Sequence, residues 1–194
     1  MAMVDLVGLH KYFIMQHISE GDTVADFTMG NGNDTLFLSK AVGERGQVYA
    51  FDIQEDALTS TREHLIANGA PENYTLICAS HDRAEEFIKD PIKAGMFNLG
   101  YLPRSGRKAV TTMRSTTMPA VEAALRLLAP DGVLIVAIYP GHEEGALEGE
   151  MLREYFSTLS RFRICPSEFK ILNSPTSPYF FLVEKSPKAK FGEI

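Results

Sequence analysis

Residues 26–35 read Asp26-Phe27-Thr28-Met29-Gly30-Asn31-Gly32-Asn33-Asp34-Thr35, and they begin at the end of a short apolar run, 23–27, that predicts a strand. Gly30 and Gly32 allow the backbone to turn tightly and to approach a ligand closely. The pattern of 35–42 predicts a helix, whose first turn presents unpaired backbone N–H groups. The stretch therefore predicts a strand, a glycine loop and a helix, the unit that binds adenosine-type cofactors in α/β folds.

Strand and helix patterns continue to alternate along the 194 residues. Repeated strand–helix units predict a parallel sheet with helices on both faces. The predicted strands are 23–27, 47–51, 74–79, 96–99, 133–138, 163–171 and 179–183. The predicted helices are 4–18, 35–42, 55–68, 83–88, 117–128 (with Pro119 in its first turn) and 148–160. We expect one domain over residues 1–194, with a doubly wound, mostly parallel seven-stranded α/β sheet whose last strand is antiparallel.

The glycine loop favours S-adenosylmethionine over a dinucleotide. Thr35 stands where the third glycine of a dinucleotide fingerprint would be. Asp26 and Asp34 suit the positive ammonium and sulfonium of S-adenosylmethionine, and they oppose a pyrophosphate. A plain strand–helix turn without a ligand is the alternative.

An acid and two neighbours follow the second predicted strand. Asp52 lies twenty positions after Gly32, where a carboxylate can accept hydrogen bonds from both hydroxyls of a ribose. Ile53 is placed to pack on the adenine, and Gln54 to reach the sugar or the base. The alternative for Asp52 is a cap on the helix that follows.

The polar end of the third strand comes next in the chain. The polar groups of Ser80, His81 and Asp82 can meet the edge of the adenine. In the alternative reading, Ser80 or Asp82 caps the short helix that follows.

The end of the fourth strand carries the candidate catalytic residues. Asn98 and Tyr101 keep the spacing of the Asn-Pro-Pro-Tyr signature of methyltransferases that act on amino groups of bases. In that chemistry the Asn carbonyl oxygen accepts a hydrogen bond from the amine, and the aromatic ring stacks on the base. Leu99 and Gly100 replace the two prolines, so an incidental Asn at a strand end is the alternative.

Two further loops should border the same pocket. The segment Pro103 to Ser115 carries a charge of +4 and no acid, against −6 for the whole chain. It is a candidate for holding RNA phosphates, for a lid, or for a solvated loop without a role. His142, in the loop 139–145, is a candidate to accept a proton or to hydrogen-bond the substrate.

Composition limits the other classes of protein. About 45% of the residues are hydrophobic, which allows a full core without metals or disulfides, and we expect no metal site. We expect the two cysteines, Cys78 and Cys165, to be buried reduced thiols. The N-terminus does not resemble a signal peptide and no apolar run would span a bilayer, so we expect a cytoplasmic protein. The sequence is compatible with a homodimer but does not require one.

The motifs resemble those of small bacterial proteins long labelled "putative rRNA methylases" and now assigned as tRNA 5-aminomethyl-2-thiouridine methyltransferases. The family patterns T-x-G-N-G-x-D-T, S-H, N-x-G-Y-L-P and Y-x-G-H are all present, and the likeness covers nearly the whole chain. Family members often have a glycine-rich, acid-containing loop where this chain has Arg104-Ser105-Gly106-Arg107. The resemblance implies a Rossmann-like methyltransferase fold and a set of cofactor contacts: Asn31, Asn33, Asp52, Gln54, Ser80 and His81.

The resemblance also implies an acceptor, the primary amine of a 5-aminomethyl group on the wobble uridine in a tRNA anticodon loop. A base in a single-stranded loop needs little unstacking to enter a pocket. The alternatives are methylation of rRNA or of a small-molecule amine, a nucleotide-binding regulator without catalysis, and a dinucleotide oxidoreductase.

Overall fold

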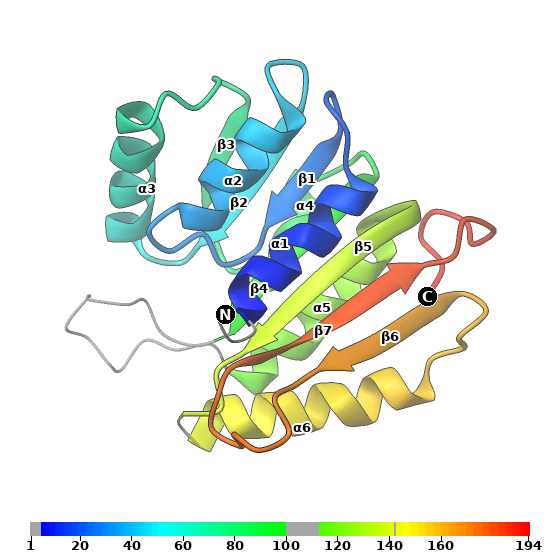
Figure 1. The fold of residues 1–194 in the computed structure, drawn as a ribbon. Helices are drawn as coiled ribbons and strands as arrows, with labels where there is room; N and C mark the ends of the chain where they lie inside the picture. The colour runs from blue at the N-terminus through cyan, green and yellow to red at the C-terminus, as the bar shows by residue number, and fades with distance from the viewer. Residues whose placement is uncertain (1–4, 100–112, 142) are drawn as a thin grey trace.

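The computed structural model describes residues 5–99, 113–141 and 143–194. Its strands form one seven-stranded sheet in the order β3-β2-β1-β4-β5-β7-β6 (Figure 1). Every neighbouring pair from β3 to β5 is parallel, and β7 is antiparallel to both β5 and β6. The predicted doubly wound sheet with an antiparallel last strand is therefore confirmed. The strands are β1 (Thr23–Asp26), β2 (Gln47–Asp52), β3 (Tyr74–Cys78), β4 (Ile92–Leu99), β5 (Leu128–Ile138), β6 (Ile164–Phe169) and β7 (Tyr179–Lys185).

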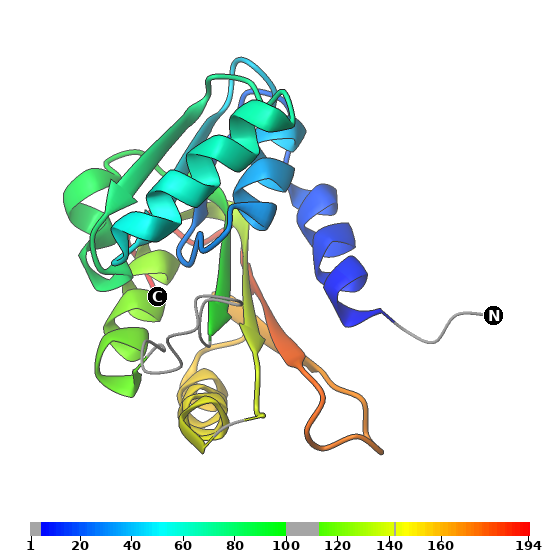
Figure 2. The same ribbon diagram turned by 90° about the vertical axis from the view of Figure 1, so that its left-hand side faces the viewer.

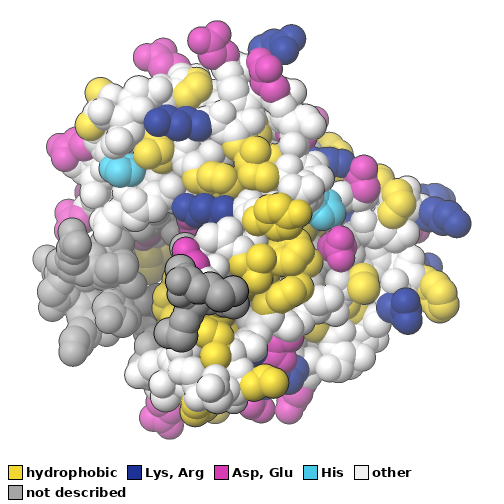
Figure 3. Space-filling model, in the orientation of Figure 1, with side chains coloured by type: hydrophobic (Ala, Val, Ile, Leu, Met, Phe, Trp, Pro, Cys, Tyr) yellow, Lys and Arg dark blue, Asp and Glu magenta, His cyan; other side chains and the backbone are white. Residues whose placement is uncertain are grey.

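Helices cover both faces of this sheet, as Figure 2 shows with the sheet seen nearly edge-on. The helices are α1 (Leu6–His17), α2 (Asn33–Val42), α3 (Glu55–Ala67), the short 3-10 helix η1 (His81–Arg83), α4 (Ala84–Phe87), α5 (Arg114–Leu127) and α6 (Glu143–Thr158). Apolar residues of α1 and α2 pack on one face, and those of α4, α5 and α6 on the other. On α1, Tyr12 and Met15 remain exposed. Figure 3 shows hydrophobic side chains gathered on the face of the molecule where α1 lies.

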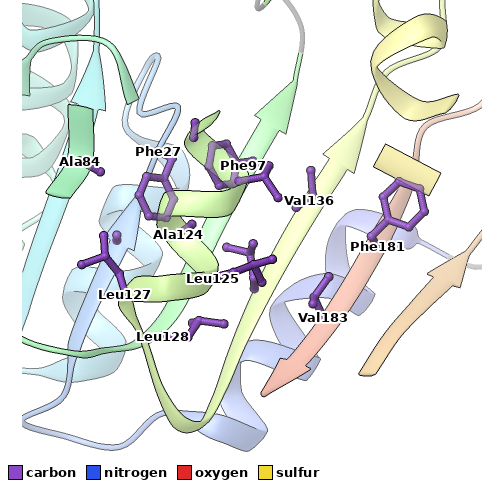
Figure 4. Packing of buried hydrophobic residues seen from close by; sticks show 14 of the residues in the cluster. Phe27, Ala84, Phe97, Ala124, Leu125, Leu127, Leu128, Val136, Phe181 and Val183 are labelled. Atoms are coloured by element: carbon purple, nitrogen blue, oxygen red, sulfur yellow. The ribbon is translucent and has the colours of Figure 1, made fainter. Parts of the chain in front are cut away.

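The larger core cluster lies between the sheet and α5, where Phe27 stacks on Phe97 with ring centroids 4.5 Å apart (Figure 4). Gly95 on β4 makes this packing possible, because a Cβ there would lie 2.8 Å from the Phe27 ring and 2.7 Å from Leu134. A glycine inside a strand weakens its local signal. The prediction accordingly began the fourth strand at residue 96, whereas β4 begins at Ile92.

Two helices begin earlier than predicted. The first residue of α5 is Arg114, so Pro119 lies inside the helix and not in its first turn. The first residue of α6 is Glu143, which shortens the loop predicted over 139–145. The added first turns of α5 and α6 contact each other. Arg114 donates to the Glu144 carboxylate from its backbone N–H and its Nε, each at 3.2 Å. Acids in the first turn of α6 also favour its N-terminus.

The residues 129–132 were predicted as a turn before the fifth strand, but they belong to β5 itself. The pairing of β5 with β4 shifts register between Ile92 and Ala94, and Asp131 has a positive φ of 59°. The turn-forming residues therefore produce an irregularity within a long strand.

Both cysteines are exposed, so the prediction of buried thiols was wrong. Cys78 ends β3 and Cys165 lies on β6, and these strands form the two edges of the sheet. An apolar sequence context indicated burial, but an edge strand leaves some of its side chains without a neighbour.

Within the parts of the chain that the structure describes, no helix is long and apolar enough to cross a membrane.

Candidate active site

The glycine loop connects β1 to α2 at the carboxyl end of the sheet. Gly30 and Gly32 both have positive φ, 52° and 79°, which side chains rarely adopt. Gly32 is also packed against α3, because a Cβ there would lie 2.8 Å from the Thr61 Cγ2. The Gly32 N–H donates to the Met29 carbonyl at 2.7 Å, and the Thr61 hydroxyl donates to the Gly30 carbonyl at 3.0 Å. These contacts fix the shape of the loop, and the two glycines allow its tight turns.

Asp26 organises this loop from inside the protein. Its carboxylate is fully buried and accepts hydrogen bonds from the Thr35 hydroxyl at 2.7 Å and the Thr28 N–H at 3.1 Å. Burial, together with the nearby Asp34 and Asp52 carboxylates, raises the pKa of Asp26 to about 7. The sequence suggested that this acid faces a cationic ligand, whereas both of its bonds hold protein groups.

Asp52, at the end of β2, faces the same loop. One of its oxygens accepts the Gly30 N–H at 3.1 Å, and the other accepts the Gln54 N–H at 2.9 Å. An ionised carboxylate has about four lone-pair positions, so each oxygen keeps a position for a further donor. Gln54 is the N-cap of α3, and the structure shows no side-chain capping bond there. The alternative in which Asp52 belongs only to a helix cap does not account for its bond to Gly30.

Residues beside Asp52 form a surface suited to a base. Ile53 is 60% exposed, directly after Asp52. Asp82 follows the neighbouring strand β3, and its Oδ1 is buried without a hydrogen-bond partner. A buried carboxylate oxygen without a donor is costly, and an exocyclic amine of a bound base would satisfy it.

The other predicted cofactor residues occupy different positions around the loop. Asn31 accepts a hydrogen bond from Ser60 at 3.3 Å, Asn33 is exposed at the start of α2, and Ser80 precedes η1 half-buried. His81 is only 9% exposed, and its Nδ1 lies 3.2 Å from the Phe27 carbonyl, to which it donates. Burial lowers the pKa of His81, so the ring is neutral and supports the end of β1. Contact of these four residues with a cofactor stays a prediction.

Asn98 lies at the end of β4 with every polar group of its amide engaged. Its Nδ2 donates to the Asp34 Oδ2 at 2.8 Å, and its Oδ1 accepts from the Tyr139 hydroxyl at 3.3 Å. The Thr28 hydroxyl accepts the Asn98 backbone N–H at 2.7 Å. A carboxylate can only accept, so Asp34 fixes which side of the amide carries nitrogen and turns the oxygen toward Tyr139. Burial and Asp34 raise the pKa of Tyr139, which keeps its phenol protonated as a donor.

Several predicted substrate-side residues lie outside the described residues. These are Tyr101, His142 and positions 103–112 of the basic segment. Arg114, one of the four basic residues counted in that segment, pairs with Glu144 on α6 at 3.2 Å. Its charge is therefore partly neutralised within the protein.

The family model described as "Putative rRNA methylase" matches residues 48–185. The chain belongs to this family. One relative is the chloroplast tRNA (mnm(5)s(2)U34)-methyltransferase of Arabidopsis thaliana. It is 38% identical to this chain over 180 residues. That match covers 88% of this chain and 65% of the relative, so the chain spans just under two thirds of the relative's length.

Solved structures show the same architecture as this rRNA methylase family member. A crystal structure of a putative rRNA methylase from Clostridium thermocellum is 36% identical with a TM-score of 0.91, covering 95% of this chain and 100% of that one. A putative methyltransferase from Streptococcus mutans, solved in complex with SAH, is 33% identical with a TM-score of 0.85. This second match covers 95% of this chain and 99% of that one.

Sequence reasoning missed two groups of the site. Lys11 on α1 pairs with Asp34, and the Tyr139 hydroxyl donates to Asn98. Tyr139 stands in the Y-x-G-H motif, so its position near His142 was a usable signal. Lys11 had none, because only the packing of α1 brings it to the site.

Proposed function

We propose that this rRNA methylase family member transfers a methyl group from S-adenosylmethionine to an amine of RNA. The acceptor we propose is the primary amine of 5-aminomethyl-(2-thio)uridine at the wobble position, in the anticodon loop of a tRNA. The observation that carries the proposal is the Asn98 amide, which Asp34 and Thr28 hold at the end of β4 with its oxygen oriented as an acceptor. The Arabidopsis relative is named as a tRNA (mnm(5)s(2)U34)-methyltransferase, and this supports tRNA as the substrate.

The residues present fit S-adenosylmethionine. The glycine loop turns tightly beside Asp52, Asp52 has spare acceptor positions for ribose hydroxyls, and Ile53 offers an apolar surface for the adenine. The unpartnered oxygen of Asp82 suits the adenine amino group. When bound, S-adenosylmethionine supplies an electrophilic methyl carbon on a sulfonium, whose carbon–sulfur bond breaks as the bond to the acceptor nitrogen forms, leaving S-adenosylhomocysteine.

The protein's own residues position the acceptor. Asn98 Oδ1 accepts one N–H of the neutral amine and thereby aims the nitrogen lone pair, taking the place of the Tyr139 hydroxyl or sharing the oxygen with it. The nitrogen gains a positive charge on methylation and then releases a proton to water, or to His142 as the sequence suggested. Stacking of Tyr101 on the uracil is part of the same proposal.

Replacing Asp52 with asparagine should weaken binding of S-adenosylhomocysteine about 10- to 100-fold. One carboxylate oxygen becomes an NH2 group, which loses a charged acceptor and meets a backbone N–H. Isothermal calorimetry measures the affinity. The matched control is Asp56→Asn on the exposed first turn of α3, which should bind like the wild type. Equal affinity of Asp52→Asn and wild type would remove the ribose role of Asp52.

The proposed acceptor is tested by nucleoside mass spectrometry of tRNA from cells with and without this protein. We expect 5-aminomethyl-2-thiouridine to accumulate, and its methylated form to disappear, in cells lacking the protein. The purified protein should then methylate that tRNA with S-adenosylmethionine. An unchanged level of the methylated nucleoside contradicts the tRNA assignment, and loss of a methyl group from rRNA would favour the family's older description.

A further inference from the structure

The N-terminal helix α1 brings a positive charge to the candidate active site. Lys11 Nζ lies 2.9 Å from the Asp34 Oδ1 and 5.0 Å from the centroid of the Phe37 ring. The other Asp34 oxygen accepts the Asn98 Nδ2. The Asp34 carboxylate therefore connects Lys11 with the Asn98 amide, which we propose to contact the acceptor amine. Lys11 comes from α1, which precedes the strand–helix repeats.

The register of the sheet explains why α1 reaches this point. Asn98 on β4 pairs with Ala137 on β5, which pairs with Phe180 on β7, so the three side chains lie on one face. The α1 helix covers this face, and the His10 ring meets the Phe180 ring edge-on at 6.1 Å. The residue after His10 is Lys11, whose Nζ reaches the Asp34 carboxylate that Asn98 also contacts.

The charge of Asp34 matters for an alkylamine acceptor. A primary alkylamine is protonated in neutral water, and its ammonium form has no lone pair for attack. An amine bound to Asn98 Oδ1 would be one amide group away from the Asp34 carboxylate. An unpaired negative charge at that distance favours the ammonium form, and an adjacent positive charge cancels this effect.

We propose that Lys11 is a positioning residue that neutralises Asp34, so that the acceptor amine reaches Asn98 in its unprotonated, nucleophilic form. This inference rests on the proposed function. Lys11 does not touch the reacting atoms and acts only through Asp34. The ion pair holds the Asp34 carboxylate in place for Asn98 while presenting no net charge to the substrate.

Other titratable groups face the Lys11–Asp34 pair from the surrounding elements. They are His10 on α1, Asp5 directly before it, Asp26 on β1 and Tyr139 directly after β5. Burial lowers the pKa of His10, which is 2% exposed and has an unpartnered Nε2, so it is neutral near pH 7. All four groups are present in every variant below. Asp34 raises the pKa of His10, Asp26 and Tyr139, so Lys11→Met, which keeps Asp34, carries the test.

The test is single-turnover methyl transfer to aminomethyl-containing tRNA between pH 6 and pH 9. In Lys11→Met, the acidic limb of the rate profile should move about one pH unit to higher pH, because unpaired Asp34 holds the proton on the amine. In Asp34→Asn, whose amide oxygen still accepts from Asn98, the limb should move to lower pH. The double variant should return near the wild-type position, and Lys11→Arg should keep the wild-type limb.

A second readout does not depend on catalysis. With S-adenosylhomocysteine present, the ratio of tRNA affinities at pH 6 and pH 9 should rise about tenfold in Lys11→Met, because its site favours the protonated amine. The control is Lys40→Met, which removes an exposed lysine from α2 and should change neither measurement. Affinity for S-adenosylhomocysteine itself should stay at the wild-type value in Lys11→Met.

Two negative results are distinguishable. Wild-type protein that never methylates aminomethyl-containing tRNA would overturn the proposed function. If the wild-type protein methylates this tRNA but the acidic limb of the Lys11→Met rate profile does not move, only the role of Lys11 is overturned. This holds whether the Lys11→Met rate falls equally at every pH or does not fall. Loss of S-adenosylhomocysteine affinity in Lys11→Met would equally overturn it, in favour of a direct contact with the cofactor.

Discussion

Replacement of Asn98 with alanine is expected to slow single-turnover methyl transfer about a hundredfold or more. The variant keeps the β4 backbone and the bond from its N–H to Thr28, but it loses the oxygen that aims the amine. A misplaced nucleophile costs about two orders of magnitude even when it stays bound. We expect the rate constant of the chemical step to fall and cofactor affinity to stay. Asn98 is not among the residues around Asp52 that we propose to bind the cofactor.

Rapid quenching with labelled S-adenosylmethionine measures this step. Affinity for S-adenosylhomocysteine should remain within a few-fold of wild type, which separates chemistry from cofactor binding. Asn68→Ala, at the exposed C-terminus of α3, is the matched control and should react like the wild type. Full single-turnover activity in Asn98→Ala would contradict the orienting role.

Replacement of Asp26 with asparagine is expected to change how stability depends on pH. The folded protein raises the pKa of this carboxyl from 3.8 to about 7 through burial and neighbouring carboxylates. Between these values the folded state binds a proton that the unfolded state does not. The contribution of Asp26 to the free energy of unfolding therefore decreases as the pH rises from about 4 to 7.

Asparagine removes this titration and keeps an acceptor for the Thr28 N–H. Its Nδ2 would donate to the Thr35 hydroxyl, which reverses the bond that Thr35 donates to Asp26. Relative to wild type, the free energy of unfolding of Asp26→Asn should increase by about 2 kcal/mol between pH 5 and pH 8. Urea unfolding at both pH values measures the difference. Asp56→Asn, at an exposed carboxyl, should show little change, and an equally small change in Asp26→Asn would show that Asp26 does not titrate in this range.

Local patterns in the sequence predicted the order of elements and the glycine loop well. Residues 23–42 carry an apolar run, two glycines and a helical pattern in immediate succession, and β1, the loop and α2 follow that order. Boundaries were predicted poorly where distant residues set them. Gly95 interrupts a local strand signal but makes room for Phe27, and the first turn of α5 is tied to α6 through Arg114 and Glu144.

Exposure of the cysteines could not be predicted for a related reason. The residues around Cys78 and Cys165 are apolar enough for a central strand, and their exposure depends on the edge positions of β3 and β6. Strand order arises from pairings between segments far apart in the chain, and no local pattern records it.

The glycine loop shows where sequence and structure each contribute. The sequence by itself determined that a tight glycine turn follows β1 and that an acid ends β2, because these depend on residue type and spacing. Only the tertiary structure decided what the acids do. Asp26 points inward and bonds Thr35. Asp34 contacts both Lys11, 23 positions before it, and Asn98, 64 positions after it. A hydrogen bond or an ion pair depends on distance in space, which the fold fixes only after α1, α2 and β4 have packed together.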